Sequence, residues 1–148
     1  MVKIDSIMQK LHTLIVSLPG TWQRMLQHNI ESYSFVEVED IAGGGLSALQ
    51  FIKKRIPNLI VIDSSIPMDD ANALIQRVKD NHPDVQIIIL TDTSYQRKNA
   101  LRYGVDFAIS SCNYEQEISE IMNKFFKSEK KDKKNFLITK KIKLSNKE

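Results

Sequence analysis

Four short apolar segments recur along the first 90 residues, and they constrain the fold more than any other feature of this sequence. They cover residues 12–16, 36–41, 58–62 and 86–90, and a weaker fifth covers 107–109. Within the third and fourth segments, residues 59–62 and 87–90 are continuously apolar and rich in β-branched residues, which is typical of parallel strands covered on both faces. The second alternates valine with glutamate, which predicts a strand near a sheet edge.

Helical periodicity fills the intervals between these segments. Apolar side chains recur at spacings of three and four in residues 21–30, after the glycines at 43–45, in 71–79 and in 113–126. Asp70 is expected to cap the third of these helices. Strands that alternate with helices imply βαβ units and right-handed crossovers. We therefore predict an α/β fold with a doubly wound, five-stranded parallel sheet between two helical layers.

Charge is divided unevenly along the chain. Residues 127–148 contain nine lysines and three acidic residues, a net charge of +6, whereas the preceding 126 residues carry a net charge of −3. We expect one domain at 12–126, an N-terminal extension at 1–11 and a basic tail at 127–148. The tail is interpreted as a solvated extension. The alternative is that it contacts nucleic acid, anionic lipid or an acidic protein by salt-sensitive charge attraction.

Composition and spacing argue against several classes of protein. There is no apolar run of about 18 residues, so no membrane span is expected. No secretory signal is evident and the single cysteine cannot form an intramolecular disulfide, which favours the cytoplasm. The three histidines and Cys112 have no metal-ligand spacing, and no nucleophile–base pair suggests an enzyme.

Three motifs, in a fixed order, resemble one signalling family. Residues 57–70 place Asp63 at the end of an apolar strand, with an Ile-Pro pair shortly after it, and residues 87–91 end in Thr91. Residues 100–106 read Ala-Leu-Arg-Tyr-Gly-Val-Asp. Together they resemble the receiver domain of response regulators, over about 12–126. The resemblance implies a flavodoxin-like (βα)5 fold, a place in two-component signalling or a phosphorelay, and Asp63 as candidate phosphoacceptor.

The sequence departs from the receiver pattern where phosphoryl chemistry needs charge. The acidic pair that helps receivers hold Mg²⁺ corresponds to Ser17 and Leu18, and their lysine corresponds to Ser111. Mg²⁺ requires near-octahedral oxygen ligation, and a serine hydroxyl supplies no charge. Asp92 would further repel an incoming phosphoryl group. The sequence therefore predicts a pseudo-receiver that binds Mg²⁺ at most weakly at Asp63.

The switch between pocket and surface is also altered. Receivers couple their hydroxyl residue, here Thr91, to an aromatic side chain that corresponds to Ala108. Phe107 is one residue away and in a strand points to the opposite face. Thr91, Ser111 and Ser17 are thus interpreted as remnants of a phosphoryl pocket. No organic cofactor is expected, because Pro19 removes an amide from the loop where flavodoxin-like proteins bind FMN.

The resemblance also implies a partner surface on the fourth helix, the fifth strand and the fifth helix. It would include Tyr95, Arg97, Lys98, Arg102 and Tyr103, and tyrosine and arginine are enriched at binding hot spots. We predict a non-enzymatic module that contacts a histidine kinase, an output protein or a second copy of itself. The alternatives are a competent phosphoreceiver using Asp63, and a regulator that contacts nucleic acid through its lysine-rich tail. A flavodoxin-like enzyme unrelated to receivers is the least favoured.

Overall fold

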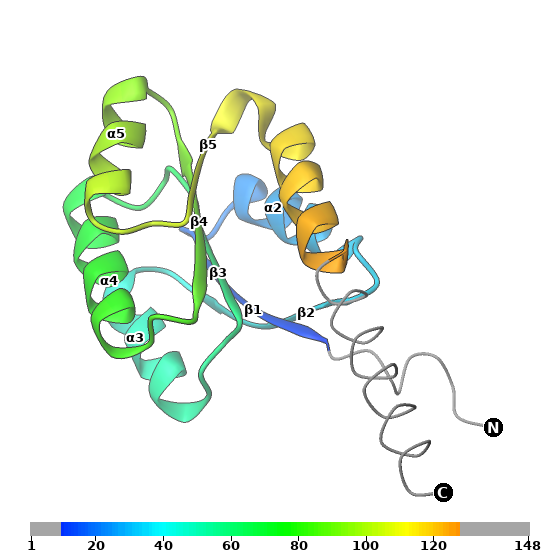
Figure 1. Ribbon diagram of the computed structural model, residues 1–148, viewed down its shortest axis with the longest axis horizontal. Helices are drawn as coiled ribbons and strands as arrows, with labels where there is room; N and C mark the ends of the chain where they lie inside the picture. The colour runs from blue at the N-terminus through cyan, green and yellow to red at the C-terminus, as the bar shows by residue number, and fades with distance from the viewer. Residues whose placement is uncertain (1–9, 128–148) are drawn as a thin grey trace, which may run out of the picture.

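A five-stranded parallel sheet forms the centre of the molecule (Figure 1). The computed structural model describes residues 10–127. The strands are β1 (Leu11–Val16), β2 (Val36–Ala42), β3 (Leu59–Ile62), β4 (Gln86–Thr91) and β5 (Phe107–Ser110). Their order across the sheet is β2-β1-β3-β4-β5, and every neighbouring pair is parallel. The predicted fold class is confirmed.

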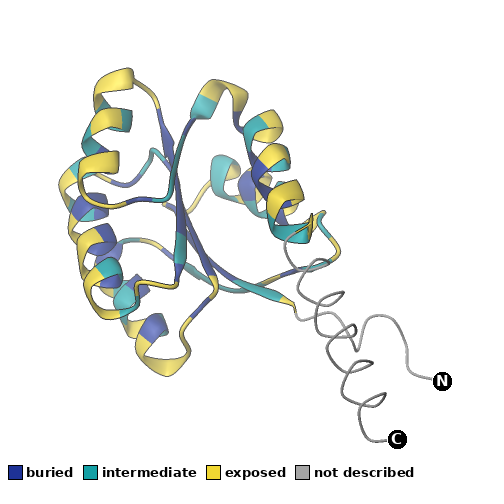
Figure 2. Ribbon diagram, in the orientation of Figure 1, coloured by how far each residue is buried: buried dark blue, intermediate teal, exposed yellow. Residues whose placement is uncertain are grey.

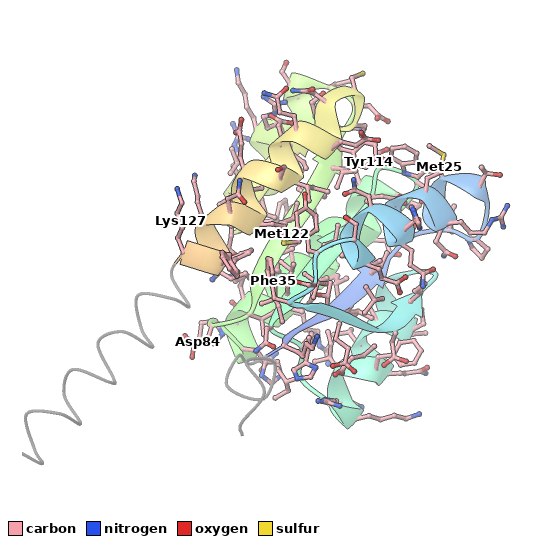
Figure 3. All side chains as sticks on the ribbon, turned by 90° about the vertical axis from the view of Figure 1, so that its right-hand side faces the viewer. Met25, Phe35, Asp84, Tyr114, Met122 and Lys127 are labelled. Atoms are coloured by element: carbon pink, nitrogen blue, oxygen red, sulfur yellow. The ribbon has the colours of Figure 1, made fainter. Side chains whose placement is uncertain are left out.

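Helices cover both faces of this sheet. Helices α3 (Gly45–Lys54), α4 (Met68–Asn81) and α5 (Ser94–Arg102) pack on one face. On the other face lie α2 (Thr21–Glu31) and a helix over residues 114–127, which follows the short 3-10 turn η1 (Ser111–Asn113). Figure 3 faces this second layer and labels Tyr114 and Met122, both buried.

Alternation along β3 divides the apolar core into two clusters. Ile60 and Ile62 pack toward α3 and α4, whereas Leu59 and Val61 pack toward α2 and the C-terminal helix. All four side chains are fully buried, and Figure 2 shows burial concentrated along the strands and the inner helix surfaces. The predicted positions of the strands in the sheet are confirmed. The continuously apolar β3 and β4 are interior strands, and the alternating β2 is an edge strand.

Two local features differ from the sequence-based expectation. The helix expected at 71–79 begins three residues earlier, at Met68, so Asp70 lies inside its first turn and does not cap it. Oδ2 of Asp70 instead accepts a hydrogen bond from the backbone N of Gly45, at 3.0 Å, and so stabilises the start of α3. Helix α5 was not recognised by apolar periodicity, because Ala100 is its single buried residue.

Within residues 10–127, no helix is long and apolar enough to span a bilayer.

Candidate functional site

The candidate site lies where the direction of the chain reverses across the sheet. After β1 the chain crosses to α2 on one face, and after β3 it crosses to α4 on the other. In open α/β sheets this reversal leaves a crevice at the carboxyl ends of the strands, which is where ligands bind. Ser17 follows β1 and Asp63 follows β3, so the two residues meet there.

Asp63 is buried and its carboxylate is fully engaged. Its side chain is 1% exposed, and its backbone N donates to the carbonyl of Val16 at 3.1 Å. Oδ2 accepts a hydrogen bond from the Ser17 hydroxyl. Oδ1 accepts one from the backbone N of Ser65, at 2.6 Å, and another from the Ser65 hydroxyl. Three donors therefore satisfy the charge of Asp63 without any cationic side chain.

The loop after β1 is held in place by the same network. The Ser65 hydroxyl oxygen accepts a hydrogen bond from the backbone N of Leu18 at 3.0 Å. The side-chain amide of Gln23 donates to the carbonyl of Ser17 at 2.7 Å. Neither Ser65 nor Gln23 was among the site residues predicted from the sequence. A signal existed for Ser65, since a residue two positions after an aspartate commonly donates its amide to that carboxylate.

Thr91 ends β4 beside Asp63, but its hydroxyl points toward β5. It is buried and donates to the carbonyl of Ile109 at 2.9 Å. Ala108 and Phe107 face opposite sides of the sheet, as their adjacency in a strand predicts. A narrow cavity runs behind Asp63 and Thr91 between α4 and α5, and the buried Asn72 lines it.

Ser111 is half-buried and faces the loop after β3. Its hydroxyl lies 3.3 Å from the hydroxyl of Ser64. A shallow depression at this end of the sheet is lined by six residues: Trp22, Ser64, Ser65, Asp92, Ser111 and Cys112. None of the described residues that line it is a lysine or an arginine, and Asp92 adds an exposed carboxylate. The structure thus brings the predicted residues Asp63, Ser17 and Ser111 to one end of the sheet.

The oxygen atoms at this site do not form a Mg²⁺-binding site like that of receivers. Mg²⁺ is usually held by carboxylates and water in octahedral geometry. Here one buried carboxylate, Asp63, is present, and both its oxygens already accept hydrogen bonds from Ser17 and Ser65. The side chain of Leu18 has no ligand atom, and Asp92 lies after β4, where its backbone N donates a hydrogen bond to Oε1 of Gln96. The residues present do not fit the ion.

Tyr114 and Trp22 flank the site from the second helical layer. Their rings meet edge to face, with centroids 4.9 Å apart. Burial raises the pKa of the Tyr114 phenol above its ordinary value of 10.0, and the neighbouring Glu115 carboxylate raises it further. The contact fixes Trp22 against the depression, so its fluorescence reports on this end of the sheet.

The expected partner surface is largely exposed. Tyr95 is 68% exposed and Tyr103 40% exposed, and Lys98 and Arg102 are exposed as well. Arg97 is half-buried, and its Nε has no hydrogen-bond partner among the described residues. The apolar Leu101, 51% exposed, belongs to the same helix and was missed by sequence analysis. Of the proposed basic tail, only Lys127 is within the described residues.

Comparison with known families and curated proteins points to one class. Residues 15–123 match the family model described as the response regulator receiver domain. Over 97 residues the chain is 34% identical to the regulatory protein LuxO of Vibrio vulnificus, which covers 62% of this chain and 21% of LuxO. A protein-glutamate methylesterase/protein-glutamine glutaminase of Methanococcoides burtonii is 29% identical over 117 residues, 76% of this chain and 33% of that protein. The chain thus spans a fifth to a third of the length of these relatives.

Solved structures show the same fold at low identity. The isolated REC domain of RcsB from Salmonella enterica serovar Typhimurium, with phosphomimetic beryllofluoride, superimposes with a TM-score of 0.70 at 15% identity. That match covers 80% of this chain and 90% of the other. A LuxR-family two-component response regulator from Aurantimonas sp. SI85-9A1 has a TM-score of 0.71 at 14% identity, covering 81% and 87%.

Proposed function

The chain belongs to the response regulator receiver domain family, and from this premise we propose that it is a pseudo-receiver. It transmits signals by protein–protein contact, and Mg²⁺-dependent phosphorylation of Asp63 is impaired. The observation that most supports this proposal is that both oxygens of the Asp63 carboxylate accept hydrogen bonds, from Ser17 and Ser65. The proposed module covers residues 12–126.

The chemistry of phosphoryl transfer supports this proposal. An attacking carboxylate oxygen must be free, and cations must neutralise the charge on the transferred group. In this pocket one oxygen of Asp63 faces the Ser17 hydroxyl, and Ser111 offers a neutral hydroxyl. The exposed Asp92 lines the shallow depression that is also lined by Ser111 and by Ser64 and Ser65, the two residues after Asp63. An approaching phosphoryl donor therefore meets negative charge, which disfavours the reaction.

The coupling between pocket and partner surface supports a constitutive module. Thr91 already donates its hydroxyl to the carbonyl of Ile109, so no phosphoryl group is needed to hold it. Ala108 offers no aromatic ring that could change position. Helix α5 therefore presents the same surface whether or not Asp63 is phosphorylated. This surface is made by Tyr95, Lys98 and Leu101, together with Arg102 and Tyr103. A histidine kinase, an output protein or a second copy of the chain is the proposed partner.

A phosphorylatable receiver is the second candidate function. The observation that favours it is the position of Asp63 and Thr91 at the ends of the adjoining strands β3 and β4. In this case a cation would have to displace Ser17 from Oδ2 of Asp63.

Amide NMR spectra with Mg²⁺ and beryllofluoride, a phosphoryl mimic, distinguish the two candidates. For the pseudo-receiver we expect the amide signals of Asp63, Thr91 and Ser111 to stay in place at millimolar Mg²⁺. Asp63→Asn is the matched control, because it removes the attacking oxygen and keeps the shape. Shifts at these amides in the wild type that disappear in Asp63→Asn would overturn the proposal and establish the phosphorylatable receiver.

A further inference from the structure

Three potential metal ligands converge at the amino ends of β1 and β2, at the opposite end of the sheet from Asp63. His12 is the second residue of β1, and its register partner in β2 is Glu37. Glu39 lies two residues further along β2, so its side chain is on the same face as that of Glu37. One ligand atom from each of the three residues lies within 4.8 Å of the other two.

These ligands are held on a rigid support. His12 and Glu39 belong to paired strands, and the backbone N of His12 donates to Oδ1 of Asn58 at 2.9 Å. The side chain of Glu39 is 15% exposed, that of His12 28% and that of Glu37 53%. The cluster is therefore open on the Glu37 side, which leaves a path for an ion and for a water ligand.

The carboxylates of this cluster share their nearby partners. Oε1 of Glu39 is buried and meets no hydrogen-bond donor in good geometry among the described residues, but it contacts the His12 ring and lies 3.1 Å from Nη2 of Arg55. Oε2 of Glu37 lies 3.8 Å from the same His12 ring, at Nδ1. Buried carboxylate oxygens are stabilised when a cation faces them directly. A divalent cation bound between His12 and the two carboxylates would face both carboxylates at once.

The chemistry of the three side chains selects the kind of cation. One imidazole and two carboxylates suit Zn²⁺, which binds three protein ligands and leaves a fourth position to water. Mg²⁺ and Ca²⁺ prefer oxygen ligands only. We infer that His12, Glu37 and Glu39 form a binding site for a transition-metal dication of the Zn²⁺ class. The site does not depend on the function proposed for Asp63.

Arg55 is the competing cation. It follows the last residue of α3, and its side chain is 60% exposed. Its guanidinium lies 3.3 Å from Nε2 and 3.4 Å from Nδ1 of His12. A long, exposed side chain can leave the cluster at low cost, and a divalent ion then replaces its single charge. The bound metal would link the edge strand β2 to β1.

The test is thermal unfolding of the full chain, freed of metal and then titrated with Zn²⁺. We expect Zn²⁺ to raise the Tm of the wild type, because a ligand that binds the folded state stabilises it. His12→Asn and Glu37→Gln should each weaken the binding about tenfold or more. His28→Asn is the matched control, since His28 is exposed and lies outside the cluster, and it should respond as the wild type does. Arg55→Ala should bind Zn²⁺ at least as tightly as the wild type.

Each outcome decides the inference. The zinc-dependent rise in Tm is measured against each variant's own metal-free Tm, so a less stable variant remains informative. If His12→Asn prevents folding, Glu37→Gln gives the answer, because Glu37 is half-exposed. Equal zinc responses in His12→Asn and His28→Asn, no response in the wild type, or a lost response in Arg55→Ala would each overturn the site. A loss confined to the ligand variants, reproduced by visible absorption of Co²⁺, would establish it.

Discussion

The Ser17 hydroxyl, at the carboxyl end of β1, donates a hydrogen bond to Oδ2 of Asp63, the residue that follows β3. The two residues are 46 positions apart in sequence, and both are buried. The resemblance to receivers aligns Ser17 with an acidic residue of that family, so under the proposed function this hydrogen bond takes the place of a metal-mediated contact. The network explains how a buried aspartate is kept satisfied without a cationic side chain.

Ser17→Asp is expected to convert this hydrogen bond into a repulsion that Mg²⁺ relieves. Two buried carboxylates side by side disfavour each other's charged form, so we expect a loss of about 2 to 4 kcal/mol in unfolding free energy without Mg²⁺. Millimolar Mg²⁺ should restore part of that loss. Urea unfolding with and without Mg²⁺ measures both effects.

Ser17→Ala is the control for this substitution. It removes the donor to Asp63 without adding charge, and it should cost about 1 to 2 kcal/mol whether or not Mg²⁺ is present. An identical Mg²⁺ response in Ser17→Asp and Ser17→Ala would show that residue 17 does not determine metal binding.

Gly45→Ala is expected to destabilise the contact between α3 and α4. A Cβ at this position would lie 2.5 Å from Oδ1 of Asp70, whose other oxygen accepts the Gly45 amide. Something must shift, and overpacking of this kind costs about 1 to 3 kcal/mol. At Gly43 no heavy atom lies within 4 Å of the added Cβ, so Gly43→Ala should stay within about 0.5 kcal/mol. Chemical denaturation of the two variants makes the comparison, and similar losses would contradict the contact.

Lys79→Met tests an ion pair at the amino end of β4. Lys79 Nζ lies 2.6 Å from Oδ2 of Asp106 and donates to the carbonyl of Val85 at 2.6 Å. The same Oδ2 accepts the backbone N of Ile87. Because Lys79 and Asp106 are 17% and 24% exposed, we expect a loss of about 1 to 3 kcal/mol in unfolding free energy.

The exposed Lys98 supplies the matched control, since no ion pair is found for it within residues 10–127. Lys98→Met should change the unfolding free energy by less than about 0.5 kcal/mol. A loss in Lys79→Met no larger than that would show that the pair contributes nothing measurable.

Tyr114 gives the protein a specific loss of stability at alkaline pH. Burial, reinforced by Glu115, raises the pKa of the folded-state phenol above its unfolded value of 10.0. Below that value Tyr114 is neutral in both states and its contribution is fully present. As pH rises through 10 the unfolded chain loses its proton first, so stability falls until the folded-state pKa is passed. Wild type should therefore lose more stability than Tyr114→Phe between about pH 9 and pH 11.

Unfolding monitored by Trp22 fluorescence in both proteins measures this difference directly. Trp22 contacts Tyr114, so the measurement also reports whether the substitution disturbs the ring pair. Parallel stability profiles for wild type and Tyr114→Phe would contradict the assigned direction of the pKa shift.

The strands were the most predictable part of this fold. Residues 59–62 and 87–90 are continuously apolar, a pattern typical of strands buried on both faces, so they predicted the interior positions of β3 and β4. Alternation at Glu37 and Glu39 predicted the edge position of β2 for the same reason. Helix α5 escaped recognition because it buries Ala100 alone and therefore has no apolar stripe.

The sequence by itself determined which strands form and which residue types end them, including Asp63, Thr91 and Ser17, because these depend on local apolar pattern. Only the tertiary structure decided which of those residues touch. The order and register of parallel strands bring Ser17 onto Asp63 and His12 beside Glu37 and Glu39. Such contacts join segments separated by 25 or more residues, and their geometry follows from how the helices pack on the sheet. Local residue preferences carry no information about that packing.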